Sequence, residues 1–225
     1  MEKKLALFPL NLVVFPGEDL NLHIFEPRYR QLINECLEGQ TTFGIPVFID
    51  NKLPGYGTEV HITTLHKRYE DGRMDIKTKG LRVFQLLNFT NPVPGKLYAG
   101  GDVTLVGPGD GSPGDDLPGN DLPGDLFSVH REQLLGLLER LYDLLQIETD
   151  EIRPDEPALS YRVGHKVGLS IEQEYDLLTL PTEAERQKYL IDHLTKVIPV
   201  VSEMERTKQR IRMNGHFKNL DPLKF

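Results

Sequence analysis

The dominant spacing of apolar residues changes near the middle of this chain, and this change constrains the fold more than any other feature. Before residue 107, apolar and polar residues alternate with a period near two, which is typical of strands. After residue 125, apolar residues recur every three to four positions, which is typical of helices. Segment 107–125 is rich in Gly, Pro and Asp and lacks the residues that build a core. We therefore expect an α+β chain with a β-rich subdomain over 1–106, a linker loop over 107–125 and a helical subdomain over 126–225.

The first third of the chain contains an ordered run of elements, FPLNLVVFPGEDLNLHIFEPRYRQLI over residues 8–33. An extended segment ends at a turn over Pro16-Gly17, and alternating residues then predict a strand over 20–24. A helix is expected to begin at Pro27, because proline fits the first helical position. Its apolar stripe consists of Tyr29, Leu32, Ile33, Cys36 and Leu37.

Two long extended segments, 57–69 and 73–89, are joined at Glu70-Asp71-Gly72, a strong signal for a β-hairpin. Alternation predicts that one face of the second segment carries Met74, Ile76, Thr78, Gly80, Arg82, Phe84 and Leu86. Arg82 then lies among apolar side chains, where a guanidinium needs a carboxylate partner. Glu26 is the candidate partner, and the alternative is that the head of Arg82 reaches solvent at the end of the sheet.

Proline, glycine and capping residues predict where the other strands and helices begin and end. A strand is expected over 41–49, with Pro46 indicating an edge position or a bulge. The last strand is expected over 96–106. Helices follow from 126, over 158–167 up to Gly168, and after the capping residues Ser170 and Thr182. Pro199 should kink the last of these helices.

Composition excludes several classes of protein. The net charge of −8 disfavours general attraction to nucleic-acid phosphates. No apolar run is long enough to span a bilayer, and we interpret the apolar start of the chain as a first strand rather than a signal peptide. The single cysteine, Cys36, excludes an internal disulfide framework and fits a cytoplasmic protein.

A search for catalytic chemistry finds no motif with the required spacing. No phosphate-binding loop with its lysine is present, and the acidic residues of 107–125 do not have the spacing of a calcium loop. His23, His61 and His66 lack the paired spacing of zinc ligands, so we expect no metal and no cofactor. Cys36 lies on an apolar helix stripe, which favours a buried thiol over a nucleophile.

A basic stretch near the end of the chain has two interpretations. It contains Arg206, Lys208, Arg210 and Arg212, and Glu203 and Glu205 precede it. The first interpretation is a nucleic-acid patch. The second, which the acidic balance of the whole chain favours, is a group of cations near a helix C-terminus.

Several segments together resemble the N-terminal, substrate-binding domain family of Lon proteases, a domain also present in cereblon. The run over 8–33 carries the resemblance, followed by Gly57–Val60, Asp71–Arg73, Gly80–Phe84 and Leu159–Val163. The resemblance covers most of the chain. It implies a PUA-like β-rich pseudo-barrel followed by a helical bundle, and it implies that a chain without the ATPase and peptidase modules of Lon neither hydrolyses ATP nor cuts peptides.

The resemblance implies a non-catalytic module that binds unfolded or extended polypeptide segments, or a protein partner, in connection with protein quality control or proteolysis. The alternative is an RNA-binding module that uses the PUA-like fold. Oligomeric state is left open. Candidate residues for a groove between the sheet and the helices are Phe48, Tyr56, Leu65 and Tyr69, whose competing interpretation is ordinary core.

We expect a structural role for the residues of the shared motif. Phe15 and Phe25 are expected to pack, the glycines to permit unusual backbone conformations, and Glu26 and Arg28 to tie the strand to the helix. The full set consists of Phe15, Pro16, Gly17, Phe25, Glu26, Pro27, Arg28, Gly72, Gly80 and Arg82.

Overall fold

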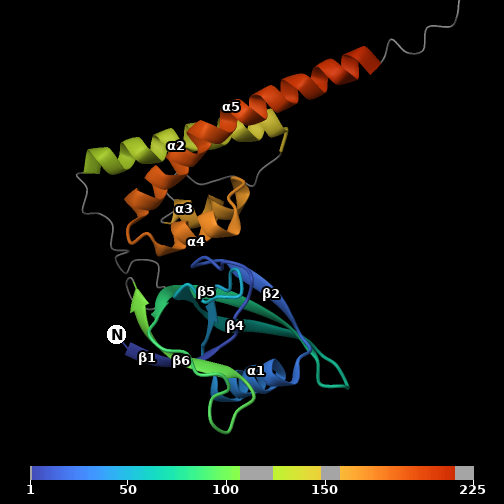
Figure 1. Ribbon diagram of the computed structural model, residues 1–225, viewed down its shortest axis with the longest axis vertical. Coiled ribbons are helices and arrows are strands. Elements are labelled where there is room, and N and C mark those ends of the chain that lie inside the picture. Colours follow the sequence, from blue (N-terminus) through green and yellow to red (C-terminus); the bar gives the residue numbers. More distant parts are fainter. Residues whose placement is uncertain (1, 107–123, 148–157, 216–225) are drawn as a thin grey trace, which may run out of the picture. The chain divides into compact units, whose positions relative to one another are not determined.

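The computed structural model describes residues 2–106, 124–147 and 158–215 (Figure 1). Contacts divide the described residues into two units. Unit 1 contains residues 2–106 and 158–186, and unit 2 contains 124–147 and 187–215. The contacts therefore divide the chain differently from the sequence-based boundaries, because residues 158–186 group with the strands. The predicted linker, apart from its last two residues, lies outside the described residues.

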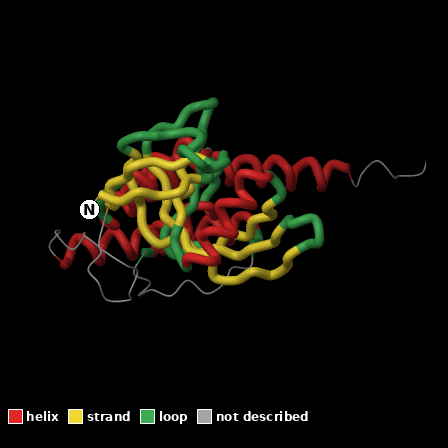
Figure 2. Tube along the Cα trace, turned by 90° about the horizontal axis from the view of Figure 1, so that it is seen from below, coloured by secondary structure: helices red, strands yellow, loops and turns green. Residues whose placement is uncertain are grey.

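Six strands form the sheet of unit 1, and five of them close into a ring (Figures 1 and 2). The order is β2-β5-β4-β3-β1-β6, and β6 pairs again with β5. Closure is possible because β5 is long: its first half pairs with β2 and its last residues pair with β6. The strands are β1 (Glu2–Leu7), β2 (Asp19–Ile24), β3 (Phe43–Pro46), β4 (Tyr56–Arg68), β5 (Met74–Leu86) and β6 (Ala99–Val106).

Helices complete both units. Unit 1 contains α1 (Pro27–Gly39), α3 (Leu159–Val163), the short 3-10 helix η1 (Gly164–Lys166) and α4 (Ile171–Thr179). Unit 2 contains α2 (Gly124–Leu145) and most of α5 (Glu183–Gly215). The α+β class predicted from the period change is confirmed. The predicted capping boxes also form, because Ser170 accepts from the amide of Gln173 and Thr182 accepts from that of Glu185.

The main core of unit 1 lies between α1 and the barrel. Tyr29, Leu32, Ile33 and Cys36 of α1 are buried, as the apolar stripe predicted. They belong to one cluster with strand residues such as Phe43, Val60, Met74 and Ile76. Burial raises the pKa of the Cys36 thiol, which fits a packing role.

A buried polar network joins α3 to the first turn of α5 and explains why residues 158–186 stay together. The Glu183 carboxylate accepts from the amide and the hydroxyl of Ser160 at 2.9 and 2.5 Å. The guanidinium of Arg186 donates to Glu183 and to the carbonyl of Leu180, and lies 4.2 Å from the centre of the Tyr161 ring. Each buried charge therefore has partners, as burial requires.

Two predictions about the sheet are wrong. The partner of Arg82 is Glu59, at 3.2 Å, and not Glu26, because a bulge between Glu59 and Val60 shifts the register and brings Glu59 opposite Arg82. Pro46 does not mark an edge, since β3 lies between β1 and β4. It is the last residue of β3, and the backbone pairing resumes at the next residue, where the amide of Val47 donates to the carbonyl of Tyr56.

Candidate functional site

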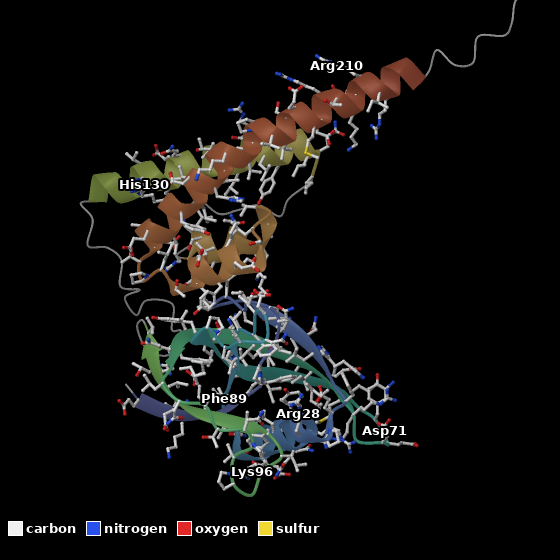
Figure 3. The ribbon with its side chains drawn as sticks, viewed as in Figure 1. Arg28, Asp71, Phe89, Lys96, His130 and Arg210 are labelled. Carbon is white, nitrogen blue, oxygen red and sulfur yellow. The ribbon has the colours of Figure 1, made fainter. Side chains whose placement is uncertain are left out.

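Three aromatic rings meet on the surface where β2 ends and the β4–β5 hairpin turns. The ring of His23 lies 6.0 Å from that of Phe25 in a stacked arrangement, and 6.0 Å from that of Tyr69 edge-on. Phe25 is 58% exposed, an unusual state for a phenylalanine. We call His23, Phe25 and Tyr69 the aromatic cluster. Asp71 marks the hairpin turn in Figure 3.

Asp75 holds two of these rings in place. Its carboxylate contacts Nδ1 of His23 at 2.6 Å and accepts from the hydroxyl of Tyr69 at 2.7 Å. These hydrogen bonds, that of His23 first, lower the pKa of Asp75, and the same bond to Asp75 raises the pKa of Tyr69. Tyr69 therefore remains a neutral donor, and the ring positions are fixed before any ligand arrives.

The local sequence explains how the aromatic cluster forms. His23 pairs directly across from Asp75 in the β2–β5 register, so their side chains share one face of the sheet. Phe25 follows the last residue of β2, and Glu26 already caps α1. Tyr69 leaves β4 where the chain turns through Gly72, whose φ of +83° favours glycine.

Cations surround the cluster on the hairpin side. The ammonium of Lys67 lies 4.5 Å from the centre of the Tyr69 ring, and the guanidinium of Arg73 lies 5.2 Å from it. Arg73 is also paired with Asp71 at 2.6 Å. The surface thus offers aromatic faces with a cationic border, a composition that is common at protein-binding hot spots.

β2 provides a second binding feature beside the aromatic cluster. Within the described part of the chain, β2 pairs with β5 alone, so its other edge is open. The amide of Gly80 donates to the carbonyl of Glu18, which makes Glu18 and Gly80 a hydrogen-bonded pair. Because such pairs alternate in antiparallel sheets, the backbone groups of Asp19, Asn21 and His23 point toward the open edge.

The structure separates the four predicted groove residues into two pairs at opposite ends of β4. Leu65 and Tyr69 lie at the hairpin end, where Leu65 is 37% exposed and Tyr69 joins the aromatic cluster. Tyr56 begins β4, and its carbonyl accepts from the amide of Val47, the neighbour of Phe48. Phe48 and Tyr56 are half-buried and do not belong to the aromatic cluster.

Tyr56 lies instead where the barrel meets the helices of unit 1. Its ring packs edge-on against that of Tyr175 from α4 at 6.3 Å. Phe15 also packs on helical residues of unit 1, with its ring 5.2 Å from that of Tyr161 and 4.6 Å from that of His165. The contact region between barrel and helices is therefore occupied by aromatic packing.

The motif residues have mixed roles. Phe15 is buried as expected, whereas Phe25 stacks on the ring of His23 and remains mostly exposed. Glu26 and Arg28 pair with each other at 2.8 Å at the surface and make no tie between strand and helix. Gly80 is required by close approach, since a Cβ there would collide with the carbonyl of Phe15.

Sequence reasoning assigned three residues of this surface to no binding role: Phe25 was expected to pack, His23 was considered only as a metal ligand, and Asp75 was given no role. The signal was present in part, because alternation placed His23 on the face opposite to the partly buried Leu22 and the buried Ile24. What was lacking was the β2–β5 register, which brings Asp75 beside His23.

Neither a metal cluster nor a membrane span is found in the residues that the structure describes. No group of three His, Cys, Asp or Glu side chains there is arranged to hold a metal ion. No described helix is long and apolar enough to cross a bilayer.

The family model for the ATP-dependent protease La (LON) substrate-binding domain matches residues 4–196. The chain belongs to this family. Solved structures agree at the level of the fold. A Lon N-terminal domain protein from Xanthomonas campestris is 24% identical with a TM-score of 0.63, and the match covers 84% of this chain and 98% of that one.

A second solved structure, the N-terminal domain of Lon protease from Mycobacterium avium complex, is 19% identical with a TM-score of 0.61. This match covers 86% of this chain and 98% of the other. A search of curated proteins gave no match. The family assignment makes this Lon-type domain a substrate-binding module, and the aromatic cluster and the β2 edge lie within the matched residues.

Proposed function

We propose that this Lon-type domain is a non-catalytic module that binds extended polypeptide segments along the open edge of β2. One aromatic or large apolar side chain of the segment is anchored on the aromatic cluster. The observation that carries the proposal is the adjacency of an exposed, prearranged aromatic surface and an unpaired strand edge at the end of β2. Because the family description names a protease, we propose that the bound segments belong to proteins destined for proteolysis.

The first step of binding is strand addition. The backbone groups of Asp19, Asn21 and His23 have the direction needed to pair with an incoming extended chain. Main-chain hydrogen bonds do not depend on the side chains of the bound segment, so strand addition suits a module that accepts many different segments. A folded protein keeps its own strands paired and has no such segment to offer.

The second step is anchoring. Once a segment lies along β2, every second side chain faces the side on which His23 projects. The exposed ring of Phe25 and the edge of Tyr69 then offer apolar surface that loses water on contact. Lys67 and Arg73 at the border favour segments without clustered positive charge.

The test compares two exposed phenylalanines. Phe25→Ser removes the anchor, whereas Phe89→Ser removes an exposed ring in the loop after β5, which is 40% exposed and labelled in Figure 3. Binding to a fluorescent, permanently unfolded polypeptide is measured by anisotropy, with a folded protein as competitor. We expect Phe25→Ser to weaken binding about tenfold or more, in line with loss of a hot-spot aromatic, and Phe89→Ser to leave it unchanged.

If both substitutions weaken binding of the unfolded polypeptide equally, the assigned site is wrong, and the domain binds apolar segments without a specific site. Unchanged binding by Phe25→Ser, with the melting temperature preserved, would remove the aromatic cluster from the proposal. Both variants change surface side chains, so both are expected to fold.

A further inference from the structure

The last turns of α5 extend beyond α2 (Figure 1), and several apolar side chains there are exposed. Earlier in α5, Leu190, Leu194 and Ile198 are almost completely buried. Farther along, Val200, Met204 and Ile211 are 60%, 65% and 67% exposed. We call residues 197–212 of α5 the outer segment. All of it lies beyond residue 196, where the match to the family model ends.

Apolar residues of the outer segment share one side of the helix. Met204 and Ile211 are seven residues apart, which is almost two full turns, so their side chains point the same way. Three valines that precede Met204 lie on the same side of the helix, namely Val197, Val200 and Val201.

Charged residues repeat at the same spacing on both flanks of this stripe. Glu203 precedes Arg210 by seven residues on one flank, and Glu205 precedes Arg212 by seven on the other. Arg210 lies near the end of α5 in Figure 3. Each flank therefore carries an acid first and a base two turns later.

The acids already have weak partners within the helix, whereas the two later arginines do not. Glu203 lies 4.0 Å from Arg206, and Glu205 lies 2.9 Å from Lys208, all at the surface. Among the described residues, no carboxylate lies within ion-pairing distance of Arg210 or Arg212.

We infer that the outer segment pairs, antiparallel, with the outer segment of a second copy of this chain. With the two-fold axis between Thr207 and Lys208, Met204 lies level with Ile211 of the second copy. The same arrangement brings Glu205 beside Arg212 of the second copy, and Glu203 beside Arg210, each offset along the helix by two residues, or about 3 Å. A parallel copy would instead set acid against acid and arginine against arginine, which costs affinity.

This pairing is self-complementary in both charge and apolar contact, which argues for a second copy rather than an unrelated partner. The covered length is short, so the interface belongs to the small, weak class and self-association in the micromolar range is expected. An acidic helix of another protein is the competing occupant, and the experiment separates the two.

Charge reversal gives the decisive test. A basic variant combines Glu203→Arg with Glu205→Arg, and an acidic variant combines Arg210→Glu with Arg212→Glu. In sedimentation equilibrium, the full wild-type chain is expected to dimerise, and each variant alone to self-associate at least tenfold more weakly. An equimolar mixture of the two variants is expected to form a heterodimer, because each acid again faces a base.

Three results would overturn the inference: a wild-type chain that stays monomeric at high concentration, variants that dimerise as well as wild type, or a mixture that remains monomeric. A monomeric wild type whose basic variant gains affinity for an acidic helical peptide would favour the competing occupant. Circular dichroism verifies that each variant keeps its helix.

Cross-linking tests the direction of the pairing. Thr207→Cys places a thiol beside the two-fold axis and is expected to form an intermolecular disulfide in mild oxidant. Val200→Cys is the control, because in the antiparallel pair its two copies lie about 22 Å apart along the helices, at 1.5 Å per residue. The native Cys36 is buried and does not compete. Cross-linking of Val200→Cys alone would overturn the antiparallel arrangement.

Discussion

Phe15 is the residue on which the contact between barrel and helices depends. It is 1% exposed and touches Tyr161 and His165 through its ring. It reaches this position because Gly164 has no side chain: a Cβ there would lie 2.5 Å from the Phe15 ring and 3.1 Å from Leu177. A glycine is therefore required here by space, since the backbone at Gly164 is helical.

Gly164→Ala should consequently destabilise unit 1 by overpacking. We expect a loss of about 1–3 kcal/mol in the free energy of unfolding, measured by urea denaturation. Gly136→Ala is the matched control, because a Cβ at Gly136 meets nothing within 4 Å and alanine favours the helix. A Gly164→Ala variant as stable as wild type would show that the Phe15 ring has room to move.

His165 makes a second residue-scale link, and its charge depends on pH. Its ring nitrogens contact Glu174 at 2.7 Å and Glu18 at 3.1 Å. Burial alone would lower the pKa of His165, but the hydrogen bonds and charges of Glu18 and Glu174 outweigh burial and raise the pKa to about 9. The imidazolium is thus held between the loop before β2 and α4.

This raised pKa predicts the direction of a pH effect. Since the folded pKa lies above the unfolded value of 6.5, the stabilisation is complete below pH 6.5 and is lost as pH rises through 9. We expect His165→Gln to lower the melting temperature more at pH 6 than above pH 10, where only the packing of the ring on Phe15 is lost. An NMR titration of His165 gives the pKa directly, and a value below 7 would contradict the assignment.

At the scale of elements, β2 carries the proposed binding edge, and proline can test it without breaking the sheet. Asn21→Pro removes an amide that points away from β5, a position where edge strands tolerate proline. The loss of one main-chain hydrogen bond to the bound segment is worth about 1 kcal/mol, or about fivefold in Kd. We expect weaker binding of the unfolded polypeptide by anisotropy, with a melting temperature near that of wild type.

Leu22→Pro is the control for this experiment. The amide of Leu22 faces β5, so its removal breaks the ladder and should lower the melting temperature markedly. If Asn21→Pro binds the polypeptide as tightly as wild type does, strand addition at this edge is wrong, and the aromatic cluster must act without it.

The sequence predicts elements more reliably than it predicts which elements touch. The α1 stripe, the β4–β5 hairpin and the capping residues Ser170 and Thr182 depend on neighbours within a few residues, and each is present. The partner of Arg82 depends on a bulge at Glu59, and alternation alone cannot locate a bulge. The make-up of the aromatic cluster could not be predicted for the same reason, since the cluster requires a register between β2 and β5.

At the scale of the whole molecule, unit 1 is built from two stretches of chain that are far apart in sequence. The period change near residue 107 marks a switch in secondary structure, but residues 158–186 return to the unit that contains the barrel. The spacing of apolar residues indicates local secondary structure, but it does not indicate which distant segments pack together. The buried hydrogen bonds among Ser160, Glu183 and Arg186 hold the two ends of segment 158–186 together.

The charge of the whole chain separates the proposed function from RNA binding. A net charge of −8 disfavours general attraction to phosphates, and the aromatic cluster and strand edge act through contacts that salt affects little. We expect the Kd for the unfolded polypeptide to change less than about threefold between low and moderate salt, and RNA not to displace it. A protein with six to ten phosphate contacts would lose about 10³–10⁵ in affinity over about 50 to 200 mM salt. Anisotropy across this range, with RNA as competitor, therefore gives opposite results for the two functions, and a steep salt dependence would assign the exposed rings to base stacking instead.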